Sequence, residues 1–503
     1  MRPVSAWFVP DLALLAAAVT LFYSLFLFQG YRTLFRDSDA GWHIRIGEAI
    51  LASGELPRTD PYSFSRPGQP WFAWEWLSDV VTGAIHRSAG LTGVALFYGG
   101  TIALGVWLWF QLQWALGGNF LVACAMAPLL LSTCNIHWLA RPHVESWVLV
   151  LIALLYLEKR GLQATGWPEA LGVAAFTALW ANIHASFFFA PMLALLYAMR
   201  GRISWRVAAL AAVAPMANPY GWGLYQHVYR YLTDSELLAR IGEFQSFDFH
   251  TAGSGQILAT VILGIAGGTL ALTAGRWEHF LLAMAVSVLA LRSARALPLA
   301  ALLLLPVANC AISERLPFKR FQAYCGRLRA LDTRFNGLAL APLLLLGAGG
   351  LLRAVPAGFP PDQFPVAAYS HLPEGGRLFA PDKFGGYLIY RSAGRRKVFF
   401  DGRSDFYGAE FLKQYSRMVQ VRPGWREIWD GWHFSHALLP NDYPLAPALE
   451  QIGWRKIYGD SVVTLLAAPE RGTGACVTTE HRQIPAGVKG YPRQGRLGGS
   501  TGG

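Results

Sequence analysis

A series of long apolar runs constrains this chain more than any other feature. Each run has about 17–20 residues, which is enough for a helix to cross the hydrocarbon core of a membrane. The composition agrees, because 53% of the 503 residues are hydrophobic and only 15% are charged, whereas soluble domains carry about 25% charged residues. We therefore predict an α-helical polytopic membrane protein.

The runs predict eleven membrane-spanning helices, whose ends the pattern defines only to within several residues. They are expected at residues 10–29, 91–112, 119–135, 146–158, 169–183, 185–199, 205–219, 256–273, 278–292, 296–313 and 336–354. The first run continues to about Gln29 without a small-residue cleavage site, so it is expected to be an anchor and not a cleaved signal peptide.

Three basic stretches indicate the orientation. Residues 158–160, 199–206 and 315–334 fall on one side of the membrane in this scheme, and basic loops are typical of the cytoplasmic side. The N-terminus is then cytoplasmic, whereas the 31–90 loop, the 220–255 loop and the residues after about 355 are extracytoplasmic. We expect a multi-pass protein of the plasma (inner) membrane of a bacterium, with its C-terminal domain in the periplasm.

The chain divides into three expected parts. Residues 1–354 form a transmembrane domain that includes the outer loop 31–90, and residues 355–470 form a small soluble α/β domain. Its expected elements are strands at 386–390, 397–400 and 461–466 and a helix at 409–419. The basic segment 471–503 is expected to be disordered.

Several function classes lack their usual signals in this sequence. The net charge of +12 is spread over short loops, so it does not indicate nucleic-acid binding. The five cysteines suggest no disulfide framework. No Cys/His spacing indicates zinc, and no Gly-rich strand–helix motif indicates a nucleotide.

The outer loop carries two acids directly after the first apolar run. Residues 39–53 and 73–86 have the periodicity of two amphipathic helices at the membrane surface. Carboxylates at the edge of a bilayer are costly to keep and are usually functional, so Asp37 and Asp39 are candidates for catalysis, although either could cap the first helix. His43 shares a helix face with Asp39, either as part of the site or as an interfacial histidine.

A third acid stands at the beginning of the second amphipathic helix. Glu75 lies between Trp74 and Trp76. An acid flanked by aromatic rings suits the flat face of a sugar. A helix cap, or a side chain that reaches up to the membrane surface, is an equal alternative.

The segment Asp39–Gly54, Asp-Ala-Gly-Trp-His-Ile-Arg-Ile-Gly-Glu-Ala-Ile-Leu-Ala-Ser-Gly, resembles the first outer loop of the GT-C superfamily of membrane glycosyltransferases. The protein O-mannosyltransferases and the lipid A aminoarabinose transferases are its nearest relatives by this resemblance. Their loop begins with an Asp-Glu pair, followed by a helix that ends in a Leu-x-x-Gly-like turn. By this match Asp39 takes the place of the catalytic aspartate, and Glu75 lies near a second acidic position.

The sequence departs from that pattern at three points. Ala40 stands where the family has its second acid, and Asp37 is an extra acid on the other side. The segment 70–77 resembles the family's next stretch, a Lys-Pro followed by aromatic residues, but no lysine precedes Pro70. The chain is closer still to a group of uncharacterised bacterial GT-C-like membrane proteins, which share the first loop and the run at residues 399–407. That likeness implies no particular substrate.

The resemblance implies an inverting glycosyltransferase. Such an enzyme moves a sugar from a polyprenyl-phosphate-linked donor to a lipid, glycan or protein acceptor, in contact with membrane lipids and without a nucleic-acid partner. Asp39 would be the general base, with Asp37 and Glu75 orienting the site. The leaving phosphate needs cations, and the candidates on the same side of the membrane are Arg141, His143, His43 and Arg295. Each of these has a structural alternative, as a loop charge, a packing histidine or an interfacial arginine.

Two further regions could contribute. Tyr229 and Glu243 belong to the 220–255 loop, which could cover a donor, receive an acceptor, or form an interfacial aromatic belt. Asp401, Arg403 and Asp405 could bind an acceptor, but an Asp–Arg pair that stabilises a turn is favoured.

The sequence is also compatible with a bound metal ion and with two other functions. A divalent metal ion bridging Asp37, Asp39 and a donor phosphate is compatible with the oxygen ligands present, which do not require one. An O-antigen ligase or polymerase would act on long lipid-linked glycans in place of single sugars. A transporter or a non-catalytic scaffold is a third reading, but the sequence has no internal repeat, and its polar clusters lie at the outer edge of the membrane.

Overall fold

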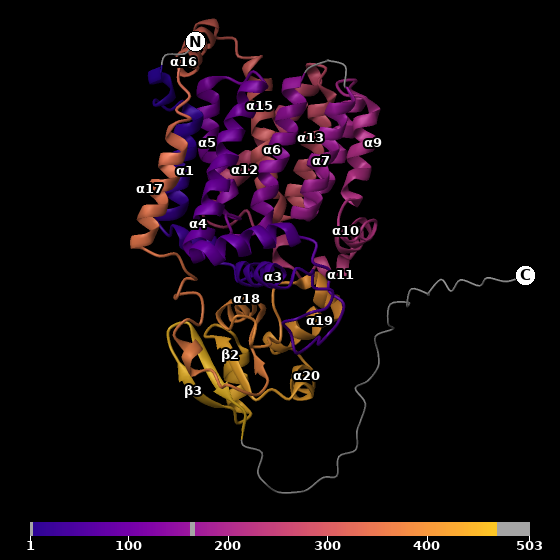
Figure 1. The fold of residues 1–503 in the computed structure, drawn as a ribbon, viewed down its shortest axis with the longest axis vertical. Helices are drawn as coiled ribbons and strands as arrows, with labels where there is room; N and C mark the ends of the chain where they lie inside the picture. The colour runs from indigo at the N-terminus through magenta and orange to yellow at the C-terminus, as the bar shows by residue number, and fades with distance from the viewer. Residues whose placement is uncertain (1–3, 161–165, 470–503) are drawn as a thin grey trace, which may run out of the picture. The chain divides into compact units, whose positions relative to one another are not determined.

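The structure is a computed structural model that describes residues 4–160 and 166–469. Residues 1–468 form one compact unit. Within this unit, Figure 1 shows helices running alongside one another in a bundle, with a helix, α3, that runs across their ends. The segment 471–503, expected to be disordered, lies outside the described residues.

The bundle is built from long helices and short irregular turns. Its helices are α1 (Leu12–Phe26), α4 (Trp76–Ala115), α5 (Phe120–Asn135), α6 (Pro142–Arg160), α7 (Trp167–Ile183), α8 (Phe189–Met199), α9 (Trp205–Val213), α12 (Ser254–Thr273), α13 (Trp277–Arg292), α14 (Leu297–Leu299), α15 (Leu305–Ser313), α16 (Lys319–Asp332) and α17 (Leu340–Ala354). The turns are η1 (Val4–Trp7), η2 (Ala185–Phe188), η3 (Ala214–Met216), η5 (Ala294–Ala296) and the π-helical η6 (Ala300–Leu304).

Each of the eleven predicted spans coincides with helical structure. Among the described residues, three helical segments are long and apolar enough to cross a membrane by length and composition: 76–115, 254–273 and 294–313. Large apolar side chains of the bundle, such as Ile262 and Leu346, are exposed, as expected for side chains that face lipid. The count of eleven spans stays a prediction, since several of the other apolar helices are shorter.

Two predicted helices are fused in the structure. The second amphipathic helix and the first span after it form the single helix α4, which bends at Gly90 (φ 61°, ψ −161°). Glycine adopts this backbone conformation without a side-chain clash. The sequence therefore located both helical stretches correctly, but the loop expected between them is a kink.

Glycines set the position of α3 (Asp39–Ser53) between two other helices. A Cβ added at Gly47 would lie 1.7 Å from the carbonyl oxygen of Asp79 in α4, and one added at Gly41 would lie 2.2 Å from that of Gly386. Gly386 belongs to α18 (Asp382–Arg391). Any larger residue at either glycine would separate the backbones, so these glycines allow α3 to pack tightly on both neighbours.

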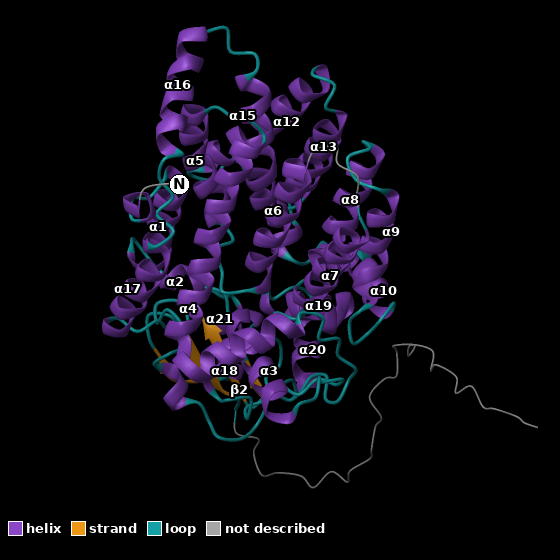
Figure 2. Cartoon of the chain, turned by 45° about the horizontal axis from the view of Figure 1, so that its top comes forward, coloured by secondary structure: helices purple, strands orange, loops and turns teal. Residues whose placement is uncertain are grey.

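The remaining elements lie in the loops and in the C-terminal region. They are α2 (Tyr31–Leu34), α10 (Gly223–Thr233), α11 (Ser235–Leu238), η4 (Gly242–Phe244), η7 (Ala368–His371), α19 (Ser404–Val419), α20 (Trp425–Trp432), α21 (Leu445–Gln451), β1 (Leu378–Phe379), β2 (His436–Pro440), β3 (Arg455–Gly459) and β4 (Val463–Ala467). Figure 2 shows the strands gathered in one place, with helices around them.

The C-terminal region contains a four-stranded sheet among the described residues, in the order β1-β2-β4-β3. β1 pairs with β2 in parallel, and the other neighbours are antiparallel. The predicted helix at 409–419 is part of α19, and the predicted strand at 461–466 overlaps β4.

Two predicted strands are wrong. Residues 386–390 lie in helix α18, because their apolar side chains pack against α3 and the neighbouring core. Residues 397–400 form no strand and make one bridge, between Ser63 and Val398. Phe399 and Phe400 belong instead to an aromatic core, which explains an apolar run without a sheet partner.

The expected boundary at residue 354 stays a prediction. Helix α17 ends at Ala354 and the sheet begins later, but both lie in the same compact unit.

Candidate active site

A large cavity lies where the outer loops, the C-terminal region and the bundle meet. Its volume is about 1440 Å³. The start of α3, the residue before α4, the start of α6, the turns η4 and η5 and the loop before α19 all contribute to its lining. The side chains predicted from the sequence that line it include Asp37, Asp39, Glu75, Arg141, His143, Glu243, Arg295, Arg403 and Asp405.

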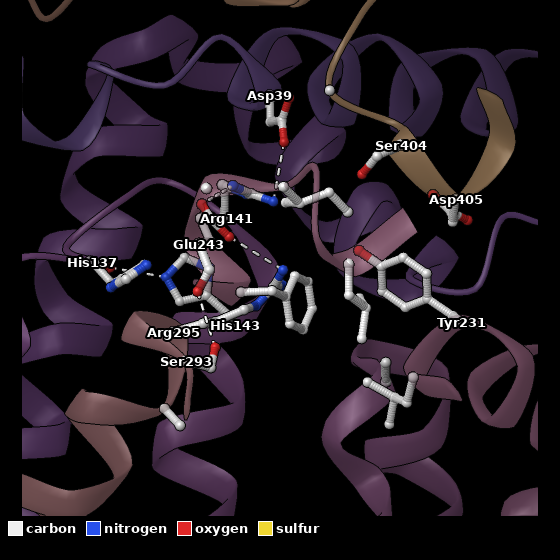
Figure 3. Close-up of a pocket in the computed structure, with 18 of the residues that line it drawn as sticks. Asp39, His137, Arg141, His143, Tyr231, Glu243, Ser293, Arg295, Ser404 and Asp405 are labelled. Carbon is white, nitrogen blue, oxygen red and sulfur yellow. Dashed lines mark hydrogen bonds and ion pairs between the residues drawn. The ribbon is translucent and has the colours of Figure 1, made fainter. Parts of the chain in front are cut away.

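Arg141 lies at the centre of the charged part of the cavity. Its guanidinium group is 2.7 Å from Asp37, 3.0 Å from Asp39 and 3.1 Å from Glu243. Glu243 also lies 3.2 Å from Arg295, and both side chains are labelled in Figure 3. Three carboxylates thus face two arginines, and both cations already have anionic partners in the described structure.

Asp37 has a second, structural task. Its Oδ1 accepts a hydrogen bond from the backbone N–H of Asp39 at 2.9 Å. Asp37 therefore satisfies a free donor at the beginning of α3, as a capping residue does. Asp39 is the first residue of the helix, and its carboxylate faces Arg141.

Burial shapes the charge state of these acids. Burial, together with the nearby charge of Asp37, raises the pKa of Asp39 to about 8, against the opposing effect of Arg141. Burial acts in the same direction on Glu243, but there Arg141 and Arg295 prevail and lower its pKa to about 2. Asp39 is therefore the better proton acceptor of the two near neutral pH, whereas Glu243 is a fixed negative charge.

The C-terminal region closes the cavity beside Asp39. A Cβ added at Gly402 would lie 1.8 Å from Oδ1 of Asp39 and 2.7 Å from Oδ2. Only glycine leaves room for the carboxylate at this point. Ser404 and Asp405 follow Gly402 along the chain and line the same cavity.

The buried side chain of Arg403 fixes the position of this loop. It is 2.8 Å from Asp60 of the outer loop and 2.7 Å from Asp401, and all three side chains are buried. The hydroxyl of Tyr407 donates to Asp401 at 2.9 Å. The favoured interpretation of Asp401 and Arg403 as a structural pair is confirmed.

Glu75 lines the cavity between two histidines. His184 Nε2 lies 3.4 Å from one of its carboxylate oxygens and His43 Nε2 lies 3.9 Å from the other. Burial raises the pKa of Glu75 to about 7. This acid can therefore exchange a proton near neutral pH.

The structure corrects the placement of His43. It is 1% exposed and does not line the cavity. Its Nδ1 lies 2.5 Å from Asp79 of α4, because the close packing of α3 on α4 turns this face of the helix toward Asp79. His43 can therefore support Glu75 from behind, but it cannot reach a donor phosphate in this structure.

Tyr229 is also placed differently from the expectation. It is 70% exposed and lies outside the cavity, whereas Tyr231, two residues later, lines it. In helix α10 a step of two residues changes the face by about 200°. His143 lines the cavity as expected, and its Nε2 lies 2.8 Å from the carbonyl oxygen of His137.

Sequence reasoning missed several lining residues. Arg292 and Lys383 line the cavity, and no ion pair to a carboxylate is found for either among the described residues. Arg292 was not missed entirely, because the sequence made the whole segment 292–295 a phosphate candidate, with Arg295 as its chosen member. Gly402 also had a signal, because it belongs to the run at residues 399–407 that the bacterial GT-C-like proteins share. Tyr231 was among the aromatic residues of the 220–255 loop that could cover a donor or receive an acceptor, but Tyr229 was chosen in its place. Lys383 had no signal.

The cavity also has an extended apolar side. This side is formed by the beginning of α8 and the end of α13, with residues Phe188, Phe189, Met192, Val288, Leu289 and Leu299. Met192 and Val288 are among the exposed large apolar side chains. The cavity is therefore lined by charges around Arg141 and by apolar side chains between two helices.

No metal site is evident in the described part of the chain. No group of three or more His, Cys, Asp or Glu residues there is arranged to hold a metal ion. The acids around Arg141 are instead neutralised by arginines. The divalent ion considered from the sequence stays a proposal without support from these ligands.

Comparison with solved structures identifies the fold. The protein is similar to the oligosaccharyltransferase of Archaeoglobus fulgidus in its apo form, with a TM-score of 0.50 and 11% identity, over 85% of this chain and 69% of that chain. The chain has the GT-C fold. The fold implied by the first outer loop is thereby confirmed.

Two further solved structures are similar to this chain at slightly lower scores. ArnT from Cupriavidus metallidurans bound to undecaprenyl phosphate has a TM-score of 0.49 and 15% identity, covering 92% of this chain and 98% of that one. The Archaeoglobus enzyme tethered to an acceptor peptide with the NVT sequon has a TM-score of 0.49 and 10% identity, covering 85% and 68%. No family model and no curated protein matches the sequence.

Proposed function

We propose that this GT-C protein is an integral membrane glycosyltransferase that transfers a sugar from a polyprenyl-phosphate-linked donor to an extracytoplasmic acceptor. One observation carries the proposal. Asp39, the acid at the position implied by the resemblance, lies on the wall of a cavity that is charged around Arg141 and apolar between α8 and α13. A lipid-linked phosphate has the same two parts, an anionic head and a long apolar chain.

The donor would bind with its chain on the apolar side. Met192 and Val288 line the cavity and have large exposed fractions, so a prenyl chain would lie against them between α8 and α13. Its phosphate would then meet the arginines at the charged side. Arginine suits this task because its planar group binds phosphate with two hydrogen bonds.

The phosphate must compete with an anion that is already in the site. Glu243 lies within 3.2 Å of both Arg141 and Arg295, and a donor phosphate would replace it on one or both arginines. Arg292 and Lys383 add positive charge to the same cavity. The cations would balance the charge that develops on the phosphate as the bond to the sugar breaks.

Asp39 would act as the general base. Its carboxylate would take the proton from an acceptor hydroxyl as the hydroxyl oxygen bonds to the anomeric carbon and the bond from that carbon to the phosphate oxygen breaks. Attack from the side opposite the leaving group inverts the anomeric centre. Asp37 would keep Arg141 and the start of α3 in position, and Glu75 would orient the sugar or acceptor.

The test is an Asp39→Asn variant, which keeps the shape of the side chain but removes its ability to accept the proton. We expect normal expression and thermal stability, with turnover lowered by about a hundredfold or more. The assay measures release of polyprenyl phosphate from a panel of polyprenyl-phosphate-linked monosaccharides. The matched control is Asp362→Asn, a change at an exposed aspartate outside the cavity.

Two outcomes would change the proposal. Wild-type turnover by the Asp39→Asn protein would remove the assignment of the base. Turnover of long lipid-linked glycans, without turnover of any monosaccharide donor in the panel, would favour the ligase or polymerase reading.

A further inference from the structure

A second polar cavity lies at the other end of the bundle. Its volume is about 490 Å³. Arg141 and Glu158 stand at opposite ends of α6, and 17 residues of helix correspond to about 25 Å. The second cavity, which Glu158 lines, is therefore well separated from the candidate active site. Its lining residues are Ala115, Leu116, Glu158, Arg200, Arg202, Arg276 and His279.

The charges that face this cavity are unequal. Three arginines line it, but Glu158 is the only carboxylate among the described residues that does. That carboxylate is already satisfied, because it lies 2.9 Å from Arg202 and 2.7 Å from His279 and accepts a hydrogen bond from Tyr197.

The other acids of the cluster lie outside the lining. Glu278 is fully buried and lies 3.2 Å from Arg200, and Glu314 pairs with Arg276. The carboxylate partners of Arg200 and Arg276 therefore lie outside the lining, whereas both arginines line the cavity. The guanidinium of Arg276 also donates to Cys310 at 2.9 Å, and the side chain of Arg200 is 38% exposed. Such an arrangement leaves guanidinium groups available to an anion.

The surroundings indicate where that anion comes from. Trp167 and Trp205 begin α7 and α9 at this same end of the bundle, and they are 58% and 60% exposed. Tryptophan gathers at the boundary between lipid and water. Further along these helices Leu171 and Val213 are exposed, as expected for side chains in contact with lipid. The cavity therefore lies at the level of lipid headgroups.

We propose that this cavity is a phosphate-binding site that holds the headgroup of an anionic membrane phospholipid between α6, α8 and α13. Arg200 and Arg276 bind the phosphate oxygens, while Arg202 is retained by Glu158 and Glu278. Basic pockets between membrane helices bind anionic headgroups in this way. The site is independent of the proposed sugar transfer.

The experiment measures binding of phosphatidylglycerol to the purified full-length protein in detergent by native mass spectrometry. We expect Arg276→Gln and Arg200→Gln each to weaken binding about tenfold, since each removes a charge-assisted hydrogen bond. Arg276→Gln leaves only the half-exposed Glu314 unpaired, so the protein is expected to fold. If one variant does not fold, the other carries the test. The matched control is Arg206→Gln, which removes an arginine beside Trp167 that does not line the cavity.

A parallel titration with inorganic phosphate distinguishes the two sources of the group. Phosphatidylglycerol binding that depends on both arginines supports the lipid headgroup. Arginine-dependent binding of inorganic phosphate alone retains the phosphate site but overturns its assignment to a lipid. The whole proposal is overturned if both arginine variants bind phosphatidylglycerol and phosphate as tightly as the Arg206→Gln protein.

Discussion

Gly402 lies directly against the carboxylate of Asp39, so closely that a methyl group at residue 402 would be 1.8 Å from Oδ1. The two residues come from distant parts of the chain, the first outer loop and the C-terminal region. The wall of the candidate site is therefore complete only when both parts are folded together. The buried pair of Arg403 with Asp60 joins the same two parts next to this contact.

The first prediction concerns Gly402. A Gly402→Ala change forces the Asp39 carboxylate to move, and a displacement of about 1 Å at a reacting group can lower turnover about a hundredfold. We expect kcat for sugar transfer to fall by about this factor while KM for the donor changes little. Gly431→Ala is the control, because a Cβ at Gly431 would have no atom within 4 Å. Equal kcat values for the two variants would show that the contact does not position Asp39.

The second prediction concerns Glu243. Its carboxylate competes with a donor phosphate for Arg141 and Arg295. Glu243→Gln keeps the size of the side chain and removes its charge, so we expect KM for the donor to fall about tenfold without a gain in kcat. Initial rates over a range of donor concentrations measure this.

The control for that experiment is Glu236→Gln, which changes an exposed acid of the nearby helix α11 that does not line the cavity. A higher KM in the Glu243→Gln protein would mean that Glu243 binds the substrate and does not compete with it.

The third prediction is the pH dependence of turnover. Burial and Asp37 raise the pKa of Asp39 to about 8. A carboxyl group can accept a proton only when it is ionised, so the rate should rise with pH by about tenfold per unit below this pKa and level off above it. Single-turnover rates between about pH 6 and pH 9 measure the profile. The residual rate of the Asp39→Asn protein should lack this inflection, and a flat wild-type profile would exclude Asp39 as the base.

The fourth prediction concerns stability. Arg403→Gln leaves Asp60 and Asp401 buried without their cation, and an uncompensated buried charge costs about 3–5 kcal/mol. We expect the free energy of unfolding to fall by this amount, measured by chemical unfolding in detergent. Arg395→Gln removes an exposed arginine of the same region and should change it by less than about 1 kcal/mol. A similarly small effect of Arg403→Gln would mean that the loop is held by other contacts.

Much of the fold followed from the sequence because apolar runs in a membrane protein leave few alternatives to helices. The positions of the helical stretches, including those on both sides of Gly90, were predicted in this way. The C-terminal region was harder, because short apolar runs occur in buried strands and in amphipathic helices alike. Residues 386–390 became a helix through contact with α3, which no local pattern reveals.

The acids of the site were found because charged residues at the end of an apolar run are conspicuous. Which side chain each acid meets did not follow from the sequence. His43 shares a helix face with Asp39 by periodicity, yet the packing of Gly47 on α4 brings it to Asp79. Sequence spacing gives the face of a helix, but the neighbouring helix decides what that face meets.

The sequence by itself determined that this protein belongs in a membrane and where its helices lie, because both follow from local composition and helical periodicity. It also made Asp37, Asp39, Glu75 and Arg141 candidates for one site, through their place at the membrane edge and the resemblance of the first outer loop. Only the tertiary structure decided which charges meet. Glu243 on Arg141, Gly402 on Asp39 and the histidines around Glu75 depend on contacts between distant segments, and burial at those contacts sets the pKa values on which the proposed chemistry depends.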